Sequence, residues 1–376
     1  MPVIHVTGTI YAISHGYKNA LNQDSLRLTT INVTSAGVIT GITSANVSEV
    51  KSNQISSIVR VSENGHASGD AVVAIYNSRY YQDEGGSAPN IVRTWRISSA
   101  GAINGEIDSL EIGPSTAGAS SNNQQLARRG TSNYYIVTLS RDSGQPWVYT
   151  FGISTNGTFE IGGVADSQLI EADQCYTPSI VNLGNNTNNF VVAYGNNSPA
   201  RSILATVSVD GLGGIIGPVD TEVFERTVSS PINLLDGYNC GFNGVITSCK
   251  PEDSNTSKLT SYPITTTALI SDEVDNITVN SGNGYDCAST SLTGNGILVN
   301  WKGDSNVGNF ATLTMDASGN FSSVINRLAM TGAQYTYGRV LVPVNGSSNP
   351  TIYLIVYCGG DVDGWSRTFD VTSICT

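Results

Sequence analysis

One short motif recurs along the chain at a nearly constant interval. A threonine, or once a serine, stands three positions before an apolar residue near the end of a strand-like run, as in LATVSV, VYTFGI and SRTFDV. Successive copies are 51 to 64 residues apart, and they stand at Thr30, Thr94, Thr150, Thr206, Ser261, Thr312 and Thr368. Repeats of this length indicate that one supersecondary unit is used seven times.

Each copy reads as four short strands. The run before the threonine strand, such as AVVAIY or FVVAYG, is almost entirely apolar and is typical of a strand buried on both faces. Another strand pattern, such as IVRV, precedes it, and a weaker one, such as GAINGEI, follows the threonine strand after a turn. Five of these turns contain a glycine that we expect to be equivalent: Gly37, Gly101, Gly157, Gly211 and Gly319.

Seven four-stranded repeats predict an all-β, seven-bladed β-propeller of antiparallel blades, formed by residues 1–376 as a single domain. The expected blades cover residues 1–50, 51–115, 116–172, 173–232, 233–282, 283–333 and 334–376. The last copy ends near the close of its third strand, which predicts a three-stranded final blade. Either the chain is cut from a longer protein, or a partner supplies the missing strand by β-augmentation.

The repeat VIHVTGTIYAISHG, followed by DGWSRTFDV, resembles the repeats of an uncharacterised prokaryotic and archaeal type of seven-bladed propeller. This resemblance covers the whole chain and implies the fold only. The Gly-His and Trp-Asp signatures of WD repeats are absent, as are the FG-GAP motif with its calcium loop and the Asp box of sialidases. No functional residue is therefore carried over from these families.

The charge of the chain restricts its partners. Only 13% of the residues are charged and the net charge is −12, which argues against nucleic acid as a partner. No apolar run is long enough to span a membrane. The N-terminus shows no signal peptide. Even so, a neutral surface of Ser, Thr, Asn and Gly resembles that of extracellular, cell-surface or virion proteins, and we expect one of those locations.

The supply of catalytic groups is small. The three histidines, His5, His15 and His66, are dispersed, and the cysteines show no C-x-x-C spacing, so neither a metal site nor a cofactor is predicted. We expect His5 to line the channel or to meet a carbonyl. Two carboxylate pairs have the composition that glycoside hydrolysis uses, Asp83 with Glu84 and Asp361 with Asp363. Turn formation is the alternative role for the second pair.

Aromatic residues suggest a binding face. Trp147, Trp301 and Trp365 stand at the junction of the second and third strands of their repeats, and Tyr80 and Tyr81 lie in the long loop NSRYYQDEGGSAPN. An antiparallel meander places these connections on one face of the disc, together with the connections between blades. Stacking on a glycan or contact with a protein is one interpretation. Packing between blades is the other.

Two cysteines suggest a disulfide. In NCGFNGVITSC, a hairpin turn at Asn243-Gly244 would bring Cys240 and Cys249 opposite each other, within bonding range in an oxidising compartment.

Two functions remain open from the sequence. The first is a non-catalytic binding or structural propeller on a cell envelope or virus particle, which contacts a glycan or a protein through one loop face. The second is a glycan-active hydrolase with acidic residues near the central channel.

Overall fold

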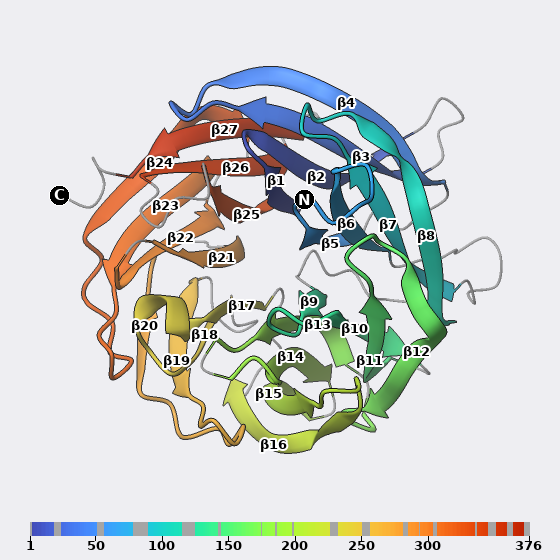
Figure 1. Cartoon of the computed structure of the whole chain (residues 1–376). Coiled ribbons are helices and arrows are strands. Elements are labelled where there is room, and N and C mark those ends of the chain that lie inside the picture. Colours follow the sequence, from blue (N-terminus) through green and yellow to red (C-terminus); the bar gives the residue numbers. More distant parts are fainter. Residues whose placement is uncertain are drawn as a thin grey trace.

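The computed structural model places the strands in a ring around a central axis (Figure 1). It describes residues 2–18, 24–50, 56–77, 89–114, 125–141, 144–173, 175–184, 186–197, 199–225, 232–249, 256–280, 285–292, 294–303, 307–334, 337–344, 351–358 and 364–371. Within these residues lie 27 strands and one short 3-10 helix. The described residues contain no helix with the length and apolar character needed to cross a membrane.

Six sheets have four strands and the seventh has three, each strand pairing with its neighbours in the chain. Blade 1 consists of β1 (Val3–Thr7), β2 (Ile10–Lys18), β3 (Asp24–Val33) and β4 (Ile39–Val50). Blade 2 consists of β5 (Ser56–Ser62), β6 (Ala71–Asn77), β7 (Pro89–Ile97) and β8 (Ile103–Pro114). Blade 3 consists of β9 (Leu126–Arg128), β10 (Tyr134–Arg141), β11 (Gln145–Ile153) and β12 (Phe159–Leu169).

The remaining blades continue the same order. Blade 4 consists of β13 (Cys175–Asn182), β14 (Asn189–Asn197), β15 (Ala200–Val209) and β16 (Ile215–Glu225), and blade 5 consists of β17 (Asn233–Asp236), helix η1 (Gly237–Cys240), β18 (Gly244–Cys249), β19 (Lys258–Pro263) and β20 (Asp275–Thr278). Blade 6 consists of β21 (Tyr285–Ser291), β22 (Gly296–Lys302), β23 (Val307–Thr314) and β24 (Asn326–Gln334). Blade 7 consists of β25 (Tyr337–Pro343), β26 (Ile352–Cys358) and β27 (Gly364–Asp370). The predicted fold, including the three-stranded last blade, is confirmed.

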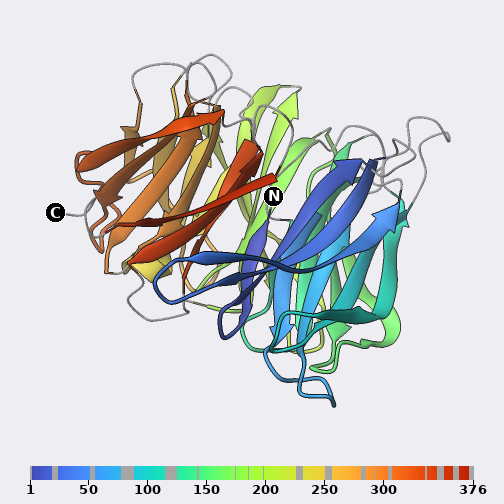
Figure 2. The same cartoon turned by 90° about the horizontal axis from the view of Figure 1, so that it is seen from above.

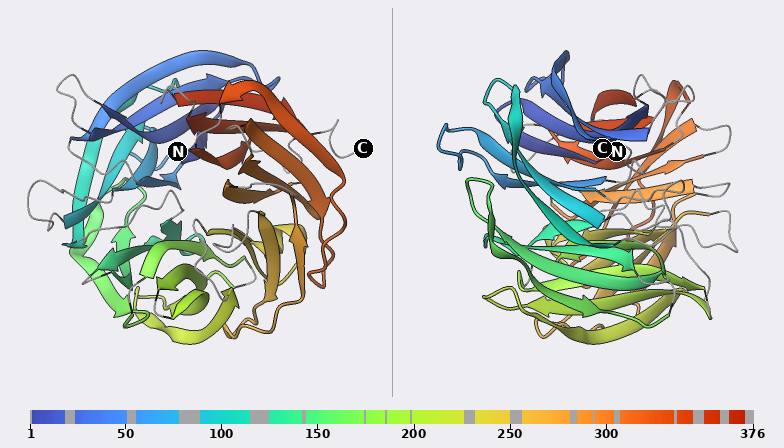
Figure 3. Two further views of the ribbon diagram at one scale, coloured as in Figure 1. Left: turned by 180° about the vertical axis from the view of Figure 1, so that it is seen from behind. Right: turned by 90° about the vertical axis from the view of Figure 1, so that its right-hand side faces the viewer.

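The first strand of each blade lies nearest the axis, and the fourth forms the outer rim (Figures 1 and 3). We call the four positions A, B, C and D. The B–C and D–A connections share one face of the disc, whereas the A–B and C–D connections share the other. Blade 7 lies beside blade 1, so the two ends of the repeat array meet (Figure 2).

The core is divided into seven apolar clusters, each shared by two neighbouring blades. Tyr76 of blade 2 packs with Tyr135 and Phe151 of blade 3, for example. A single meander cannot cover both of its faces, so the stability of each blade depends on its neighbours. The cluster between blades 7 and 1 includes Leu354 and Tyr11, and it closes the ring. The strands that the structure describes pair only within their own blades.

The threonine column is a set of hydrogen bonds between blades. In six of the seven members, the hydroxyl donates to the carbonyl oxygen of the C–D turn of the next blade. The bonds are Thr30 to Gly101 (2.5 Å), Thr94 to Gly157 (2.6 Å), Thr150 to Gly213 (2.5 Å), Thr206 to Ala268 (2.6 Å), Ser261 to Gly319 (2.7 Å) and Thr368 to Gly37 (2.6 Å). The expected satisfaction of these hydroxyls by a neighbouring blade is confirmed. We call the contact between two neighbouring blades a joint, and we call this hydrogen bond the hydroxyl bond of the joint.

The turn glycine of blade 4 is Gly213 rather than the expected Gly211. In every described C–D turn, the N–H of the glycine position bonds the carbonyl three residues earlier, as from Gly101 to Ser98 and from Gly213 to Asp210. That position has a positive φ, which is +86° at Gly213. Asp210-Gly211 therefore starts the turn, and the left-handed residue follows two positions later. Ala268 occupies this position in blade 5, with a φ of +66°.

A second column, on strand D, completes the joints. An Asp directly opposite the Thr or Ser accepts a hydrogen bond from the backbone N–H two residues after the next blade's turn position. These bonds are Asp108 from Phe159 (2.9 Å), Asp166 from Ile215 (2.8 Å), Asp220 from Ile270 (2.8 Å) and Asp275 from Phe321 (2.8 Å), with the Ser44 hydroxyl accepting from Ile103 (3.3 Å) in blade 1. We call this contact the carboxylate bond of the joint.

The expected Cys240–Cys249 disulfide is not formed. The hairpin at Asn243-Gly244 does not exist because β18 pairs with β17, with Leu235 opposite Ile246. Cys240 instead ends helix η1, in the core between blades 5 and 6, while Cys249 packs between blades 4 and 5. The two thiols therefore lie in different inter-blade clusters.

Candidate functional site

The tryptophans predicted for the loop face stand at the B–C ends of their blades. Trp301, near the end of β22, is 5% exposed and packs in the core of blades 5 and 6. Trp147, at the start of β11, is half-buried, and its ring centroid lies 6.2 Å from that of Tyr149. In the structure, these two rings therefore contribute mainly to packing. Trp365 lies in β27, but its side chain is outside the described residues, as are Tyr80 and Tyr81.

The carboxylate pairs predicted for hydrolysis, Asp83 with Glu84 and Asp361 with Asp363, also lie outside the described residues. Within the described ranges, no group of three or more His, Cys, Asp or Glu comes together in a way that could hold a metal ion.

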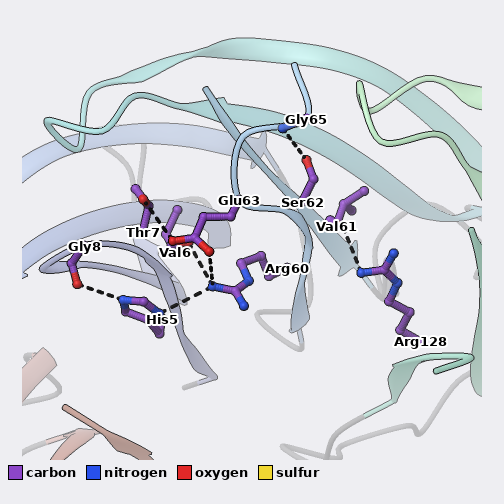
Figure 4. Close-up of polar contacts among 10 residues, drawn as sticks. All are labelled: His5, Val6, Thr7, Gly8, Arg60, Val61, Ser62, Glu63, Gly65 and Arg128. Carbon is purple, nitrogen blue, oxygen red and sulfur yellow. Dashed lines mark hydrogen bonds and ion pairs between the residues drawn. The ribbon is translucent and has the colours of Figure 1, made fainter. Parts of the chain in front are cut away.

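The charged residues that the structure does bring together lie at the inner rim of blades 1 to 3, on the A–B face (Figure 4). We call His5, Arg60, Glu63 and Arg128 the inner-rim cluster. Equivalent positions near the ends of three consecutive A strands hold His5, Arg60 and Arg128. Their partners on the neighbouring B strands are Tyr11, Val73 and Tyr135, respectively. The spacing of the repeat, and not the local sequence, brings them to one rim.

The two arginines join neighbouring blades in the same way. Arg60 Nη1 donates to the carbonyl of Val6 in blade 1 (3.2 Å), and Arg128 Nη1 donates to the carbonyl of Val61 in blade 2 (3.0 Å). Arg128 also donates to the carbonyls of Ser132 and Thr131. The Arg128 guanidinium is therefore committed to backbone groups, a role that its planar fork of donors suits.

His5 is oriented by two contacts. Its Nε2 lies 2.9 Å from the carbonyl oxygen of Gly8, which only accepts, so the proton is on Nε2. Nδ1 is then the acceptor for Arg60 Nη1, at 3.5 Å. The expectation that His5 meets a carbonyl is confirmed. His15 lies within β2, and its Nε2 is 2.9 Å from the Thr29 hydroxyl oxygen.

Glu63 moderates the positive charge of the cluster. Its Oε2 lies 3.8 Å from Arg60 Nη1, and its Oε1 accepts from the Thr7 hydroxyl at 3.4 Å. The side chains of Arg60 and Glu63 are 39% and 47% exposed, so water and salt screen this pair. The contacts of Arg60 with His5, Val6 and Glu63 all involve its Nη1.

In blade 5, a carboxylate rather than a guanidinium bonds the backbone of the preceding blade. Asp236, the last residue of β17, accepts from the N–H of Gly184 in blade 4 (3.0 Å) and from the N–H of Tyr238 (3.1 Å). Burial raises the pKa of Asp236, while these two N–H groups act in the opposite direction. Asp236 could not be recognised in the sequence, because LLDGYN reads as an ordinary Asp-Gly turn.

The carboxylates of Asp236 and Glu63 each take part in a contact between neighbouring blades, 4 with 5 for Asp236 and 1 with 2 for Glu63. The buried thiols are poor nucleophiles, because burial raises the pKa of both Cys175 and Cys240 to about 12.

Comparison with known proteins identifies the fold and no family. No family model matches the chain, and no curated protein matches it. Among solved structures, the periplasmic gluconolactonase of Pseudomonas aeruginosa is similar over 95% of this chain and 96% of its own, with a TM-score of 0.61 and 11% identity. The Dos1 propeller is similar over 97% of this chain and 79% of its own, with a TM-score of 0.50 and 13% identity.

At such low identities, these similarities concern the propeller fold alone.

Proposed function

We propose that this protein is a non-catalytic propeller that acts as a binding or structural module on an exterior surface, a cell envelope or a virus particle. Its partner is a glycan or another protein, which it contacts through the face formed by the B–C and D–A connections. The ring of joints holds that face rigid, and rigid presentation of loops lowers the entropy cost of binding.

The observation that carries the proposal is the use of polar groups at the inner rim. Arg60, Arg128 and Asp236 each bond the backbone of the preceding blade. A catalytic site keeps its acid, base or nucleophile directed at a substrate. Here these side chains hold blades together, so they support a scaffold role. The low charge and net charge of −12 add support, since they fit a neutral ligand or partner better than a polyanion.

Alanine substitution on the loop face tests the proposal. We expect Tyr80→Ala and Tyr81→Ala to weaken binding on a glycan array, or to a partner captured from a surface extract, by about 1–3 kcal/mol for each side chain that acts as an anchor. Tyr238→Ala is the matched control, because Tyr238 is 53% exposed on the opposite face of the disc. Its binding should equal that of the wild type.

The hydrolase alternative predicts the reverse ranking. Asp83→Asn, Glu84→Asn, Asp361→Asn and Asp363→Asn should then abolish turnover of a panel of fluorogenic glycosides while binding persists. Glycoside turnover that disappears with one of these four substitutions would refute the non-catalytic proposal. Tyr80 and Tyr81 variants that bind like the wild type would remove the proposed loop contact.

A further inference from the structure

Exposed apolar side chains gather at the outer rim of the disc. Eleven large apolar side chains are exposed in the described residues, and all except Tyr238 belong to D strands or to C–D connections. In blades 3 to 5, the most exposed of them are Ile161, Leu212, Ile216 and Leu269, and we call these four the rim patch. Isolated apolar residues are common on protein surfaces, whereas a group of them on one surface marks an interaction site.

β-bulges lift two of these side chains out of the rim strands. In β12, residues 160–163 stand opposite Gly152 alone, and Ile161 within this bulge is fully exposed. In β16, a similar bulge begins directly after Ile216. Bulges interrupt the regular row of backbone N–H and C=O groups, so these edges are poor templates for an incoming strand. A partner therefore binds this surface through side chains.

The joints bring the rim patch together from three consecutive blades. β12 and β16 lie next to each other along the rim (Figure 1). The turn that carries Leu212 is held against β12, because the Ile215 N–H donates to Asp166 at 2.8 Å. The turn of blade 5 that carries Leu269 is held against β16 by the carboxylate bond of that joint, also at 2.8 Å. The four side chains therefore belong to one arc of the rim.

The same arc is acidic. Its D strands and C–D connections, residues 154–169, 210–225 and 264–278, contain nine Asp or Glu residues and no Lys or Arg. Arg129 and Lys258, from outside these segments, offset two of the negative charges. A surface with exposed apolar side chains among carboxylates is complementary to a partner that is apolar and basic. It disfavours a second copy of this chain, because two such surfaces repel each other.

We propose that the rim patch is the docking surface for an amphipathic helix of a partner protein, whose apolar stripe is flanked by Lys or Arg. The stripe packs on Ile161, Leu212 and Ile216, and the basic residues face carboxylates such as Glu160 and Glu222. A helix supplies apolar anchors at i, i+3, i+4 and i+7 without pairing its backbone, which suits the bulged edges of β12 and β16. This surface is separate from the loop face of the proposed function.

A synthetic helix tests the proposal. The probe is a fluorescein-labelled peptide of about 18 residues that contains only Leu and Lys, with Leu at helical spacing. Its control has the same composition in a scrambled order that forms no apolar stripe. We expect the probe to bind the wild-type protein saturably in fluorescence anisotropy, and the scrambled peptide to bind about tenfold more weakly. Binding of the probe should weaken as the salt concentration rises, because salt screens the charge pairs.

Matched variants locate the peptide on the rim patch. Leu212→Ser and Ile161→Ser should each weaken binding about tenfold, because each removes an apolar anchor. Ile42→Ser is the control and should bind like the wild type. Ile42 is 71% exposed beside a bulge of β4 on the same rim, but Glu49 is the only charged residue of that strand. Glu160→Gln should weaken binding and reduce its dependence on salt.

Four results would overturn the proposal. Equal binding of the two peptides would show that charge alone attracts them. Retained binding by Leu212→Ser and Ile161→Ser, or an equal loss in Ile42→Ser, would place the peptide elsewhere. No saturable binding up to about 1 mM probe would exclude the site. A dimer in sedimentation velocity that Leu212→Ser converts to monomer would assign the patch to a second copy of the chain. These substitutions change exposed side chains, so urea unfolding should show wild-type stability for each variant.

Discussion

Substitution of Thr94 by Val isolates the contribution of one hydroxyl bond. Thr94 is completely buried, and its Oγ1 donates to the carbonyl of Gly157 at 2.6 Å. Valine keeps the shape of the side chain, so the packing of the joint is retained. The substitution removes one hydrogen bond, worth about 0.5–1.5 kcal/mol, and leaves a buried carbonyl unpaired, which costs about 1–3 kcal/mol. We expect the free energy of unfolding to fall by about 1–3 kcal/mol.

Equilibrium urea unfolding followed by intrinsic fluorescence measures this change. For a chain of 376 residues, the same loss lowers the Tm by about 1–4 °C. Thr40→Val is the matched control, because Thr40 is exposed on β4, and its effect should stay within about 0.5 kcal/mol.

Combination with other substitutions tests whether the bond belongs to a joint. Thr206→Val acts on a different joint, between blades 4 and 5, and its cost should add to that of Thr94→Val. Asp108→Ala removes the carboxylate bond of the same joint, so the two costs should differ from additivity by at least about 0.5 kcal/mol. A Thr94→Val variant as stable as Thr40→Val would refute the role assigned to the threonine column.

Three further predictions follow from the described residues. Gly157→Ala should lower the free energy of unfolding by about 2–4 kcal/mol, because Gly157 has a φ of +95° and an added Cβ would lie 2.5 Å from Ile107 Cδ1. Gly41→Ala is the control: an added Cβ there meets open space, so the same urea experiment should show a smaller loss of stability. Cys175 and Cys240 should resist iodoacetamide at pH 8 in the native state, since burial raises the pKa of each thiol to about 12, and peptide mapping that finds either one alkylated would contradict this. The free energy of unfolding should decline as the pH rises from about 9 to about 12, because burial raises the pKa values of Cys175, Cys240 and Tyr135 in the folded state. The contribution of these groups to stability is complete at neutral pH and is lost as the pH passes the raised pKa values. An unfolding free energy that is flat over this range would show that these groups are not buried.

The fold could be predicted from the sequence because the signal was repeated seven times. Thr94, Thr150 and Thr206 stand 56 residues apart within similar apolar surroundings, so each copy supported the others. The satisfaction of the hydroxyls could also be predicted, since a buried hydroxyl needs a partner. The acceptor could not be predicted, because it is a backbone carbonyl of the next blade.

The carboxylate column was missed for a physical reason. Strand D contains bulges, so the distance from the threonine to its opposite residue changes from 14 residues at Asp108 to 16 at Asp166. Ser44 replaces the Asp in blade 1, which weakens the pattern further. The error at Gly211 has a related cause. A sequence with four nearby glycines does not reveal which one takes the positive φ until the turn bond from Gly213 to Asp210 is known.

The inner-rim cluster illustrates a further limit of sequence reading. Arg60 and Arg128 are 68 positions apart in the chain, and neither forms part of a local motif. Only the ring places them in equivalent positions, where each bonds the carbonyl of the preceding blade. Asp236 was hidden in the same way, because its partner Gly184 belongs to another blade.

The fate of a bound ligand tests the central claim most directly. The protein is incubated with the glycan or partner fragment that binds it best, and the ligand is recovered after many binding half-lives and weighed by mass spectrometry. A non-catalytic propeller predicts saturable binding and recovery of the intact ligand in full. A cleaved product that accumulates with time, and that Asp83→Asn or Asp361→Asn prevents, would show that the protein is an enzyme.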